Sequence, residues 1–492
     1  MEDGLQYKLM KKIPNWINGL EAMPSSGLWL KKINPANERV DSLFSDSNQK
    51  DVESAVKFAQ KAFITWSKIS PVKRGQILFN LVDILKINRS SLAKCVARET
   101  GKSYQDALGE VGAAIAQGEF FAGEGRRLYS NSLNSALDNK FCQTIREPHG
   151  PVGLIVPANT PIANIAWKIF PALICGNTII LKASEDSPEI ALLIAKLSKE
   201  ADIPDGVLNV IQGHGHIVGE SLIKDIRIPL ISFTGSTAIG KHIASVVGLR
   251  MGRVSLELGG KNPFIVCDDA DIEAAVNWCA LSAFSNAGQR CAAASRIIIF
   301  ESIYDDFVKK LIKKSEKFIL GVDKNSDIGP VINKKQYISI LKHIENATQE
   351  GGNILCGQSG NRLNSKKGYY IRPTLIENVK FSSEIFNKEI FGPVATVHKV
   401  RNKEEALRVA NKSEFGLTAA VHTKNINRGL WFAKNLISGT VNINSGTYGS
   451  EPHMPFGGFG SSGNGTREPG TEALNVYSEL KNISFLINLD AN

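Results

Sequence analysis

The sequence contains few cysteines and no long apolar run. Seven cysteines occur in 492 residues, and no two of them are spaced as Cys-x-x-Cys. This sparse, odd number argues against a disulfide framework or a zinc ribbon. It favours a reducing, cytoplasmic location, where a special cysteine acts as a nucleophile. No apolar stretch reaches the roughly 18–20 residues that span a bilayer. The best candidate, 172–181, is interrupted by Gly176 and Asn177.

Targeting signals, repeats and metal motifs are also absent. Residues 1–8 lack a basic segment followed by an apolar one, so we expect no secretory signal. No low-complexity segment and no fixed-period repeat occurs. His214 and His216 form a short His-Gly-His segment. Because no cysteine or carboxylate set accompanies them at metal spacing, we expect a loop and no metal site.

The charge is positive but dispersed. There are 58 Lys and Arg against 48 Asp and Glu, a formal net charge of +10. The basic residues are scattered, and none of them forms a basic segment interleaved with aromatic side chains. We therefore expect a solvated surface and neither a nucleic-acid nor a membrane partner. The alternative is that the charge steers an anionic partner or substrate.

The chain is too long for one hydrophobic core, so we predict two or three packed domains. Residues 51–125 show the three-to-four spacing of apolar residues that is typical of helices, with Gly101 as a stop. From about residue 150 to residue 233, short strands alternate with helices, which predicts a parallel, doubly wound sheet. In this series Ser187 is expected to cap a helix that starts at Pro188. A second series, from about residue 263, predicts another α/β domain.

Two further strand-like segments, 140–146 and 475–487, lie far apart in the sequence. Each alternates apolar and polar residues. Strands of this kind could pair with each other or with a neighbouring subunit.

Two segments carry the residue types of covalent catalysis. Cys291 follows Gly288 and lies among small residues, a setting that leaves a thiol accessible, and Arg290 could favour its thiolate. A buried structural cysteine is the alternative. Glu257 lies between Leu256 and Leu258, where ionisation is difficult, so its pKa should rise toward that of a general base. A salt-bridged strand end is the alternative.

Two further segments suggest a nucleotide site. Gly235 and Gly240 flank a turn between a strand and a helix, where backbone N–H groups can face a phosphate. The segment is not the Gly-x-Gly-x-x-Gly fingerprint and lacks the lysine of a P-loop. Lys182 and Glu185 follow a predicted strand, where ligands bind in open α/β sheets. Taken alone, these two side chains are better explained as surface charges.

Taken together, these segments resemble the aldehyde dehydrogenase superfamily from about Asn15 to about Lys481. Glu257-Leu-Gly-Gly-Lys looks like the family's glutamate signature, and Gly288-Gln-Arg-Cys291 looks like its cysteine signature. Glu389-Ile-Phe391-Gly-Pro393 and Pro455-Phe-Gly-Gly458 match two more motifs. The resemblance implies a Rossmann-like doubly wound cofactor domain, a second α/β catalytic domain and a small β oligomerisation element. The implied boundaries are 1–125 and 148–256 for the cofactor domain, 257–459 for the catalytic domain, and 126–147 and 460–492 for the oligomerisation element and tail.

The resemblance also implies a role for each matching residue. Cys291 would attack the aldehyde, Asn159 and the Cys291 N–H would stabilise the oxyanion, and Glu257 would activate water for thioester hydrolysis. Proton relay is assigned to Lys168 and Glu468. The implied cofactor is NAD, with NADP also possible. Its residues would be Lys182 and Glu185 at the ribose, Gly235 and Ser236 with Gly240 at the pyrophosphate, and Glu389 and Phe391 at the nicotinamide.

The sequence departs from the family around Asn159, where two aromatic residues are replaced by Ala158 and Thr160. We therefore expect a wider or more polar substrate tunnel, suited to a semialdehyde or a sugar-derived aldehyde. Further tunnel candidates share proximity to the motifs: Trp167, Arg290, Tyr448, His453 and Phe456.

We expect an aldehyde substrate, a carboxylic acid product and a homodimer or homotetramer. The alternatives are a CoA-acylating semialdehyde dehydrogenase, disfavoured because those members generally lack the glutamate, and an inactive binding or structural member of the fold.

Overall fold

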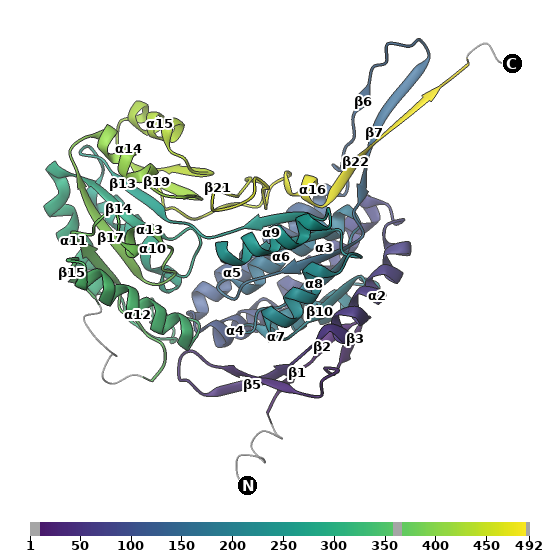
Figure 1. Cartoon of the computed structure of the whole chain (residues 1–492), viewed down its shortest axis with the longest axis horizontal. Helices are drawn as coiled ribbons and strands as arrows, with labels where there is room; N and C mark the ends of the chain where they lie inside the picture. The colour runs from purple at the N-terminus through teal and green to yellow at the C-terminus, as the bar shows by residue number, and fades with distance from the viewer. Residues whose placement is uncertain (1–9, 358–366, 489–492) are drawn as a thin grey trace, which may run out of the picture.

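The computed structural model describes residues 10–357 and 367–488, so the segment 1–8 considered for a signal lies outside the described residues. Two lobes lie side by side, and an arm projects from one of them (Figure 1). Each lobe contains a seven-stranded sheet with helices on both faces. The predicted α/β fold with two largely parallel sheets is therefore confirmed.

The first sheet has the strand order β12-β11-β8-β9-β10-β2-β3. Its strands from β12 to β10 are parallel, and β2 joins β10 in the antiparallel sense. Ile179 and Leu181 face one core and Ile180 faces the other, as a period of two requires. The strands are β2 (Asn15–Ile17), β3 (Leu20–Ala22), β8 (Pro151–Ile155), β9 (Thr178–Lys182), β10 (Leu208–Ile211), β11 (Leu230–Thr234) and β12 (Arg253–Glu257).

Helices cover both faces of this sheet. On one face lie α6 and α7, with α3, α4 and α5 packed against them, and on the other lie α2, α8 and α9. The helices are α2 (Gln49–Trp66), α3 (Pro71–Ile87), α4 (Arg89–Thr100), α5 (Tyr104–Glu124), α6 (Pro161–Cys175), α7 (Pro188–Glu200), the π-helix η1 (Gly215–Gly219), α8 (Glu220–Lys224) and α9 (Thr237–Leu249). The predicted helical stretch 51–125 is confirmed, and Gly101 ends α4 with φ 77°.

The expected cap of α7 is wrong. Ser187 precedes the helix, but its side chain makes no capping hydrogen bond. The buried carboxylate of Glu99 instead accepts from the backbone N–H groups of Glu189 (2.7 Å) and Ile190 (3.0 Å). A carboxylate satisfies the same free N–H groups and also complements the helix dipole. A residue 90 positions away therefore replaces the local cap.

The second sheet has the order β15-β16-β17-β14-β13-β19-β20, and all neighbours from β16 to β20 are parallel. Helices α10 and α11 pack on one face, and α14 and α15 on the other. The strands are β13 (Asn262–Val266), β14 (Ala294–Phe300), β15 (Asn353–Cys356), β16 (Thr374–Glu377), β17 (Val394–Val400), β19 (Thr418–His422) and β20 (Thr440–Ile443). The helices are α10 (Ile272–Phe284), the 3-10 helices η2 (Ser285–Gly288) and η3 (Glu301–Ile303), α11 (Tyr304–Glu316), α12 (Lys334–Gln349), α13 (Glu384–Asn387), α14 (Lys403–Asn411) and α15 (Ile426–Asn435).

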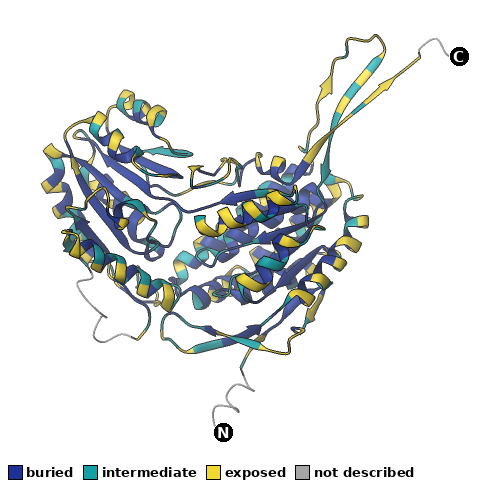
Figure 2. Ribbon diagram, viewed as in Figure 1, coloured by how far each residue is buried: buried dark blue, intermediate teal, exposed yellow. Residues whose placement is uncertain are grey.

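The arm is a three-stranded antiparallel sheet of order β22-β7-β6. Its two long strands pair along their length, and the rings of Phe141 and Phe485 stack with centroids 5.7 Å apart. The strand-like segments near residues 140–146 and 475–487 therefore pair with each other, which confirms the first of the two predicted alternatives. Most of the arm is exposed or half-buried (Figure 2). The strands are β6 (Ser132–Leu133), β7 (Lys140–Pro148) and β22 (Ser478–Leu486).

Short elements complete the chain. Strands β1, β5 and β4 form a small sheet, β18 pairs with β21, and α16 precedes β22. They are β1 (Lys12–Ile13), β4 (Trp29–Ile33), β5 (Val40–Ser45), β18 (Phe415–Gly416), β21 (Phe459–Gly460) and α16 (Ala473–Val476).

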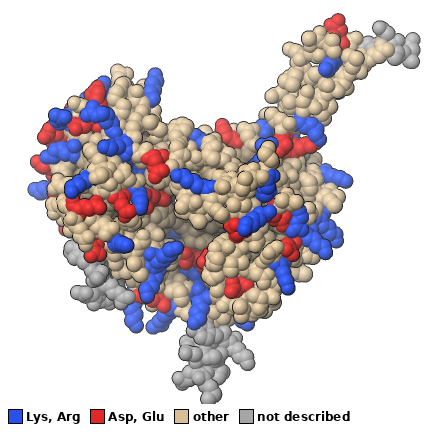
Figure 3. All heavy atoms as spheres, in the orientation of Figure 1, with Lys and Arg blue, Asp and Glu red and all other residues tan. Residues whose placement is uncertain are grey.

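The surface carries charges of both signs. Cations and carboxylates are interspersed on the face drawn in Figure 3, which shows no continuous basic stripe. Among the described residues, no helix has the length and apolar character needed to cross a membrane.

Candidate active site

A cavity of about 390 Å³ draws its wall from both lobes. Many of the predicted site residues line it, although they come from separate parts of the sequence. They are Asn159, Trp167, Gly235, Ser236, Glu257, Cys291, Glu389, Phe391 and Phe456. The Cys291 thiol, the Glu257 carboxylate and the Asn159 amide therefore share one cavity.

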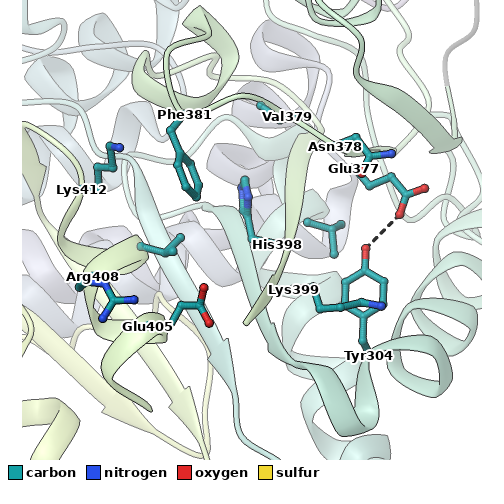
Figure 4. A pocket seen from close by; sticks show the side chains of 12 residues that line it. Tyr304, Glu377, Asn378, Val379, Phe381, His398, Lys399, Glu405, Arg408 and Lys412 are labelled. Carbon is teal, nitrogen blue, oxygen red and sulfur yellow. Dashed lines mark hydrogen bonds between the residues drawn. The ribbon is translucent and has the colours of Figure 1, made fainter. Parts of the chain in front are cut away.

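A second cavity, of about 590 Å³, is lined by residues of the second lobe alone (Figure 4). Its wall contains none of the predicted site residues. The Tyr304 hydroxyl donates to Glu377 at 3.0 Å, and the Lys399 ammonium lies 4.5 Å from the centre of the Tyr304 ring. Since no cysteine lines this cavity, its larger volume gives it no claim to the predicted covalent chemistry.

The nucleophile loop begins with an unusual turn. Asn286, Ala287 and Gly288 all have positive φ (54°, 54° and 65°), so Gly288 supplies the predicted tight turn before Cys291. For Ala287 such a conformation costs about 1–2 kcal/mol. The Asn262 side chain then donates to the Cys291 carbonyl at 2.7 Å. These contacts fix the loop so that the half-buried Cys291 lines the cavity.

Asn159 is held against this loop. Its amide nitrogen donates to the Gln289 carbonyl at 2.9 Å, which leaves its second N–H for a ligand. The Lys102 ammonium donates to the Asn159 carbonyl at 2.8 Å and also pairs with buried Glu110. Two buried, paired charges thus support the segment that carries the predicted oxyanion donor.

Glu257 ends strand β12 and is buried, with 4% of its surface exposed. Neither carboxylate oxygen has a hydrogen-bond partner within the described residues. Burial, reinforced by the nearby Glu468, raises the pKa of Glu257 well above its ordinary value, although Lys168 partly opposes this. The predicted direction of this shift is confirmed, and the alternative of a salt-bridged strand end is wrong.

The glutamate signature also makes room for a second carboxylate. A Cβ on Gly259 would stand 2.2 Å from an oxygen of Glu389, and a Cβ on Gly260 would stand 2.5 Å from the Cys291 carbonyl. The Gly260 N–H donates to Glu389 at 3.1 Å. The missing side chains of the two glycines permit this close approach. It brings the glutamate signature, the Glu389 motif and the cysteine signature together.

The electrostatics of the thiol differ from expectation. Burial raises the pKa of Cys291 to about 12, and the carboxylates of Glu389 and Glu257 raise it further. Arg290 acts in the predicted direction, but its effect is outweighed. The thiol is therefore protonated at neutral pH in the free protein. Burial likewise raises the pKa of Glu389 to about 7, against the opposing effects of the Gly260 N–H and Lys261.

Lys168 and Glu468 do not line the cavity, but they contact each other. Both are buried, and the Lys168 ammonium lies 2.8 Å from a Glu468 oxygen. A close, hydrogen-bonded ion pair is the usual condition for burying two charges. The pair lies near enough to Glu257 to affect its pKa.

The proposed nucleotide residues lie along the carboxyl end of the first sheet. Lys182 ends β9, and its ammonium lies 3.9 Å from Glu185. Burial favours the neutral form of Glu185, but Lys182, the Gly215 N–H and His214 hold its pKa below the ordinary value. Glu185 is therefore charged at neutral pH.

The end of β11 leads into the N-terminus of α9 beside the cavity. Gly235 and Ser236 line the cavity; the Gly235 N–H donates to the Glu257 carbonyl at 3.0 Å, and Ser236 precedes α9 without making a side-chain capping bond. Free N–H groups at a helix N-terminus suit a phosphate. Gly240 lies within α9 instead, where its missing Cβ admits the Leu258 side chain. It does not line the cavity, and its predicted contact with the cofactor stays a prediction.

Three of the predicted substrate residues lie outside the cavity wall. The Arg290 guanidinium lies 4.9 Å from the centre of the Tyr448 ring. His453 is exposed, with a nitrogen 3.9 Å from Glu451. Trp167 and Phe456 do line the cavity and meet edge to face at 5.4 Å.

Sequence reasoning missed several lining residues. Thr234 adjoins Gly235, so the motif itself could have indicated it. Asn164, Gln336 and Ser339 lie on α6 and α12, and nothing in the sequence distinguishes them from other helix positions. Gln336 donates to the Ile390 carbonyl at 2.8 Å and so holds the segment that carries Phe391.

The comparisons with known proteins agree with this geometry. Residues 23–483 match the aldehyde dehydrogenase family. The chain belongs to that family. The predicted family and its reaction class, aldehyde oxidation by an NAD(P)-dependent enzyme, are confirmed.

Individual relatives extend over almost the whole chain. It is 37% identical to α-ketoglutaric semialdehyde dehydrogenase of Bacillus subtilis, across 95% of this chain and 97% of that one. A putative aldehyde dehydrogenase from Burkholderia cenocepacia has a TM-score of 0.95 at 33% identity, covering 98% and 99% of the two chains. Betaine aldehyde dehydrogenase from Staphylococcus aureus in complex with NAD+ has a TM-score of 0.94 at 33% identity, covering 98% and 96%.

Proposed function

We propose that this aldehyde dehydrogenase oxidises a polar aldehyde to a carboxylic acid with NAD, by the hydrolytic route. The observation that carries the proposal is the convergence of Cys291, Glu257 and Asn159 on one cavity. A nucleophile, a base and an oxyanion donor suffice for covalent acyl chemistry.

The residues would act in two stages. The Cys291 sulfur attacks the aldehyde carbon while Glu257 takes the thiol proton. Asn159 and the Cys291 N–H stabilise the oxyanion of the thiohemiacetal. When bound, the dinucleotide accepts the hydride. Once Glu257 has lost the thiol proton to solvent, it removes a proton from water, which attacks the thioester; the acid is released, and the Cys291 sulfur regains a proton.

The cavity and the carboxyl end of the first sheet suit a nicotinamide cofactor, with Lys182 and Glu185 lying outside the cavity wall. Glu389 and Phe391 would hold the nicotinamide end, Ser236 and Gly235 the pyrophosphate, and Lys182 with Glu185 the adenosine ribose. The charged Glu185 favours NAD, since a carboxylate beside a 2′-phosphate costs Coulomb energy. The NAD+ complex of the Staphylococcus aureus relative supports the assignment. NADP remains open as a second cofactor.

The cavity wall indicates the substrate class. The Asn164 amide donates to the Thr160 hydroxyl at 2.7 Å, which places polar groups at the position of the missing aromatics. No lysine, arginine or histidine lines the cavity, whereas two glutamates do. A neutral polar aldehyde, such as one derived from a sugar, fits this wall better than an acidic one. A semialdehyde is the second candidate, favoured by the Bacillus subtilis relative.

The hydrolytic route is favoured over acyl transfer to CoA. Glu257 faces the cavity with both oxygens unpaired within the described residues, as a base for water must. Strict dependence of acid release on CoA would instead establish the acylating alternative.

We also propose an assembly of two or four copies and a cytoplasmic location. The arm exposes apolar side chains that no other part of the described chain covers, including Phe141, Phe485 and Leu486. A second copy would cover them. All seven cysteines are free, which suits a reducing compartment. We further assign the first sheet to cofactor binding and the second to catalysis.

The decisive experiment compares Cys291→Ala with Cys142→Ala over a panel of aldehydes, read as NADH absorbance. Loss of the nucleophile should reduce turnover by at least about 10³-fold, with NAD affinity almost unchanged. Cys142 lies in the arm and is a matched control. Retained turnover in Cys291→Ala would refute the proposal. The panel also separates sugar-derived aldehydes from semialdehydes and aromatic aldehydes.

A further inference from the structure

The buried carboxylate of Glu468 is the centre of a dense hydrogen-bond network. It is 0% exposed and accepts from four side chains. The donors are the Lys168 ammonium (2.8 Å), the Ser232 hydroxyl (3.0 Å), the Ser255 hydroxyl (3.0 Å) and the Tyr477 hydroxyl (2.9 Å). The Lys168 ammonium alone would neutralise the charge of this carboxylate, so the three hydroxyl donors are additional to the ion pair.

The register of two strands explains why the serines meet there. Ser232 of β11 lies opposite Ser255 of β12, and two residues further along Thr234 lies opposite Glu257. Because side chains alternate across a strand, both pairs lie on one face of the sheet. The serines therefore lie on the same face as the proposed base.

A chain of hydroxyl groups leads from Glu468 to the surface. The Ser255 oxygen is 3.0 Å from the Thr466 hydroxyl, which is 2.9 Å from the Asn464 side-chain oxygen. Thr466 is partly exposed and Asn464 is exposed. Asn464 is fixed because it accepts from the Leu256 N–H (2.9 Å) and donates to the Val254 carbonyl (2.8 Å).

The chain can carry hydrogen in either of two orders. Each hydroxyl has one hydrogen and can also accept. When Glu468 is charged, Ser255 donates to it and Thr466 donates to Ser255. When Glu468 is protonated, it donates to Ser255, Ser255 donates to Thr466, and Thr466 donates to Asn464. Conversion between the two orders moves one proton from the buried carboxyl group to Thr466, which is partly exposed and releases its own hydrogen to solvent water, because the amide oxygen of Asn464 is too weak a base to take it.

The proposed base lies beside this chain. A Cβ on Gly457 would stand 2.9 Å from a Glu257 oxygen and 2.7 Å from the Thr466 carbonyl. Glu257 has no direct hydrogen bond to Lys168 or Glu468. Glu468 and Lys168 both influence the pKa of Glu257, so the pair lies close enough to interact with the proposed base.

We propose that Ser255 and Thr466 conduct the proton of thioester formation from the Lys168–Glu468 pair to solvent. The inference rests on the proposed function. In thioester formation the Cys291 thiol loses its proton as the C–S bond forms, and the substrate carbon loses a hydride to NAD. One proton per active site must therefore leave. It passes from Glu257 to Glu468, then along Ser255 and Thr466 to solvent.

The test follows proton release and NADH formation in the same stopped-flow experiment, with a pH indicator in weak buffer. The variants are Thr466→Val, which removes the hydroxyl but keeps the shape, and Thr466→Ser, which keeps the hydroxyl. Thr471→Val is the control, because Thr471 is exposed in the same loop and its hydroxyl has no partner within the described residues. Ser255→Ala tests the inner link.

In wild type, Thr466→Ser and Thr471→Val, proton release should coincide with NADH formation. In Thr466→Val and Ser255→Ala it should lag by about tenfold in rate, while the NADH burst keeps its amplitude. If proton release still coincided with NADH formation in Thr466→Val, the proton pathway would be overturned and the proposed function would stand. Absence of NADH formation by the wild type with every aldehyde of the panel would overturn the proposed function, and the pathway with it. A structural defect would lower the burst amplitude and would not be reversed in Thr466→Ser.

Discussion

The Asn159 amide donates to the Gln289 carbonyl at 2.9 Å, a hydrogen bond that joins the two lobes at the nucleophile loop. Asn159 follows a strand of the first sheet, whereas Gln289 precedes a strand of the second. The distance between the proposed oxyanion donor and Cys291 is therefore set by how the lobes pack.

Asn159→Ala should lower kcat by about 10²–10³-fold, because one oxyanion donor is lost. Its effect on KM should be much smaller, since this interaction forms mainly in the transition state. Steady-state kinetics with a good substrate provides the measurement. Asn164→Ala is the control: it alters the polar wall and should change KM for polar aldehydes more than kcat. Unchanged kcat in Asn159→Ala would contradict the assignment.

Glu257→Gln should slow both stages of the reaction. The amide can take a proton neither from the Cys291 thiol nor from water, so the first formation of NADH and steady-state turnover should both be slowed, by about 10²–10⁴-fold. Rapid mixing follows the first NADH, and mass spectrometry detects the acylated protein. Steady-state turnover equal to that of the wild type would show that another group activates water.

Alkylation of Cys291 in the free protein should accelerate with pH without a plateau below pH 10. The thiolate is the reactive form, and burial with two nearby carboxylates raises the pKa of this thiol to about 12. The rate with iodoacetamide should rise about tenfold per pH unit, read by peptide mass spectrometry.

Glu389→Gln should accelerate this alkylation above pH 7. In the unaltered protein Glu389, with its pKa raised to about 7, becomes negative there and opposes thiolate formation. If instead the alkylation rate of Cys291 in the unaltered protein stopped rising near pH 8, its thiol would have a lower pKa, and a nearby cation would be offsetting the effect of burial.

Glu185→Gln should tighten NADP binding by about tenfold while changing NAD binding little, because it removes one charge beside the expected position of the 2′-phosphate. The amide oxygen can still accept from the Gly215 N–H, so the loop should keep its shape. Titration of protein fluorescence gives both Kd values. Parallel changes in both affinities would argue against a ribose contact.

Phe485→Asp should dissociate the assembly. Phe485 stacks on Phe141 at the exposed end of the arm, and burying a new carboxylate against a second copy is costly. Light scattering after size-exclusion chromatography reports the mass. Phe381→Asp, on an exposed side chain of the second cavity, is the control. An unchanged mass for Phe485→Asp would place the contact elsewhere.

Much of the fold could be predicted because it depends on local patterns. The alternation of side chains between two cores along β9 and the three-to-four spacing of buried residues along α2 follow from strand and helix geometry. Tertiary contacts were not predictable in the same way. The cap of α7 comes from Glu99 because that carboxylate is buried beside the helix only in the folded protein.

The sequence by itself determined the family, the order of the motifs and the identity of the proposed nucleophile and base. It could not determine that burial would hold the Cys291 thiol in its protonated form, or that Arg290 would lie beside Tyr448 instead of lining the cavity. Only the tertiary structure decided these points. The reason is physical: pKa values and hydrogen bonds depend on distances and burial, which arise when segments far apart in sequence pack together.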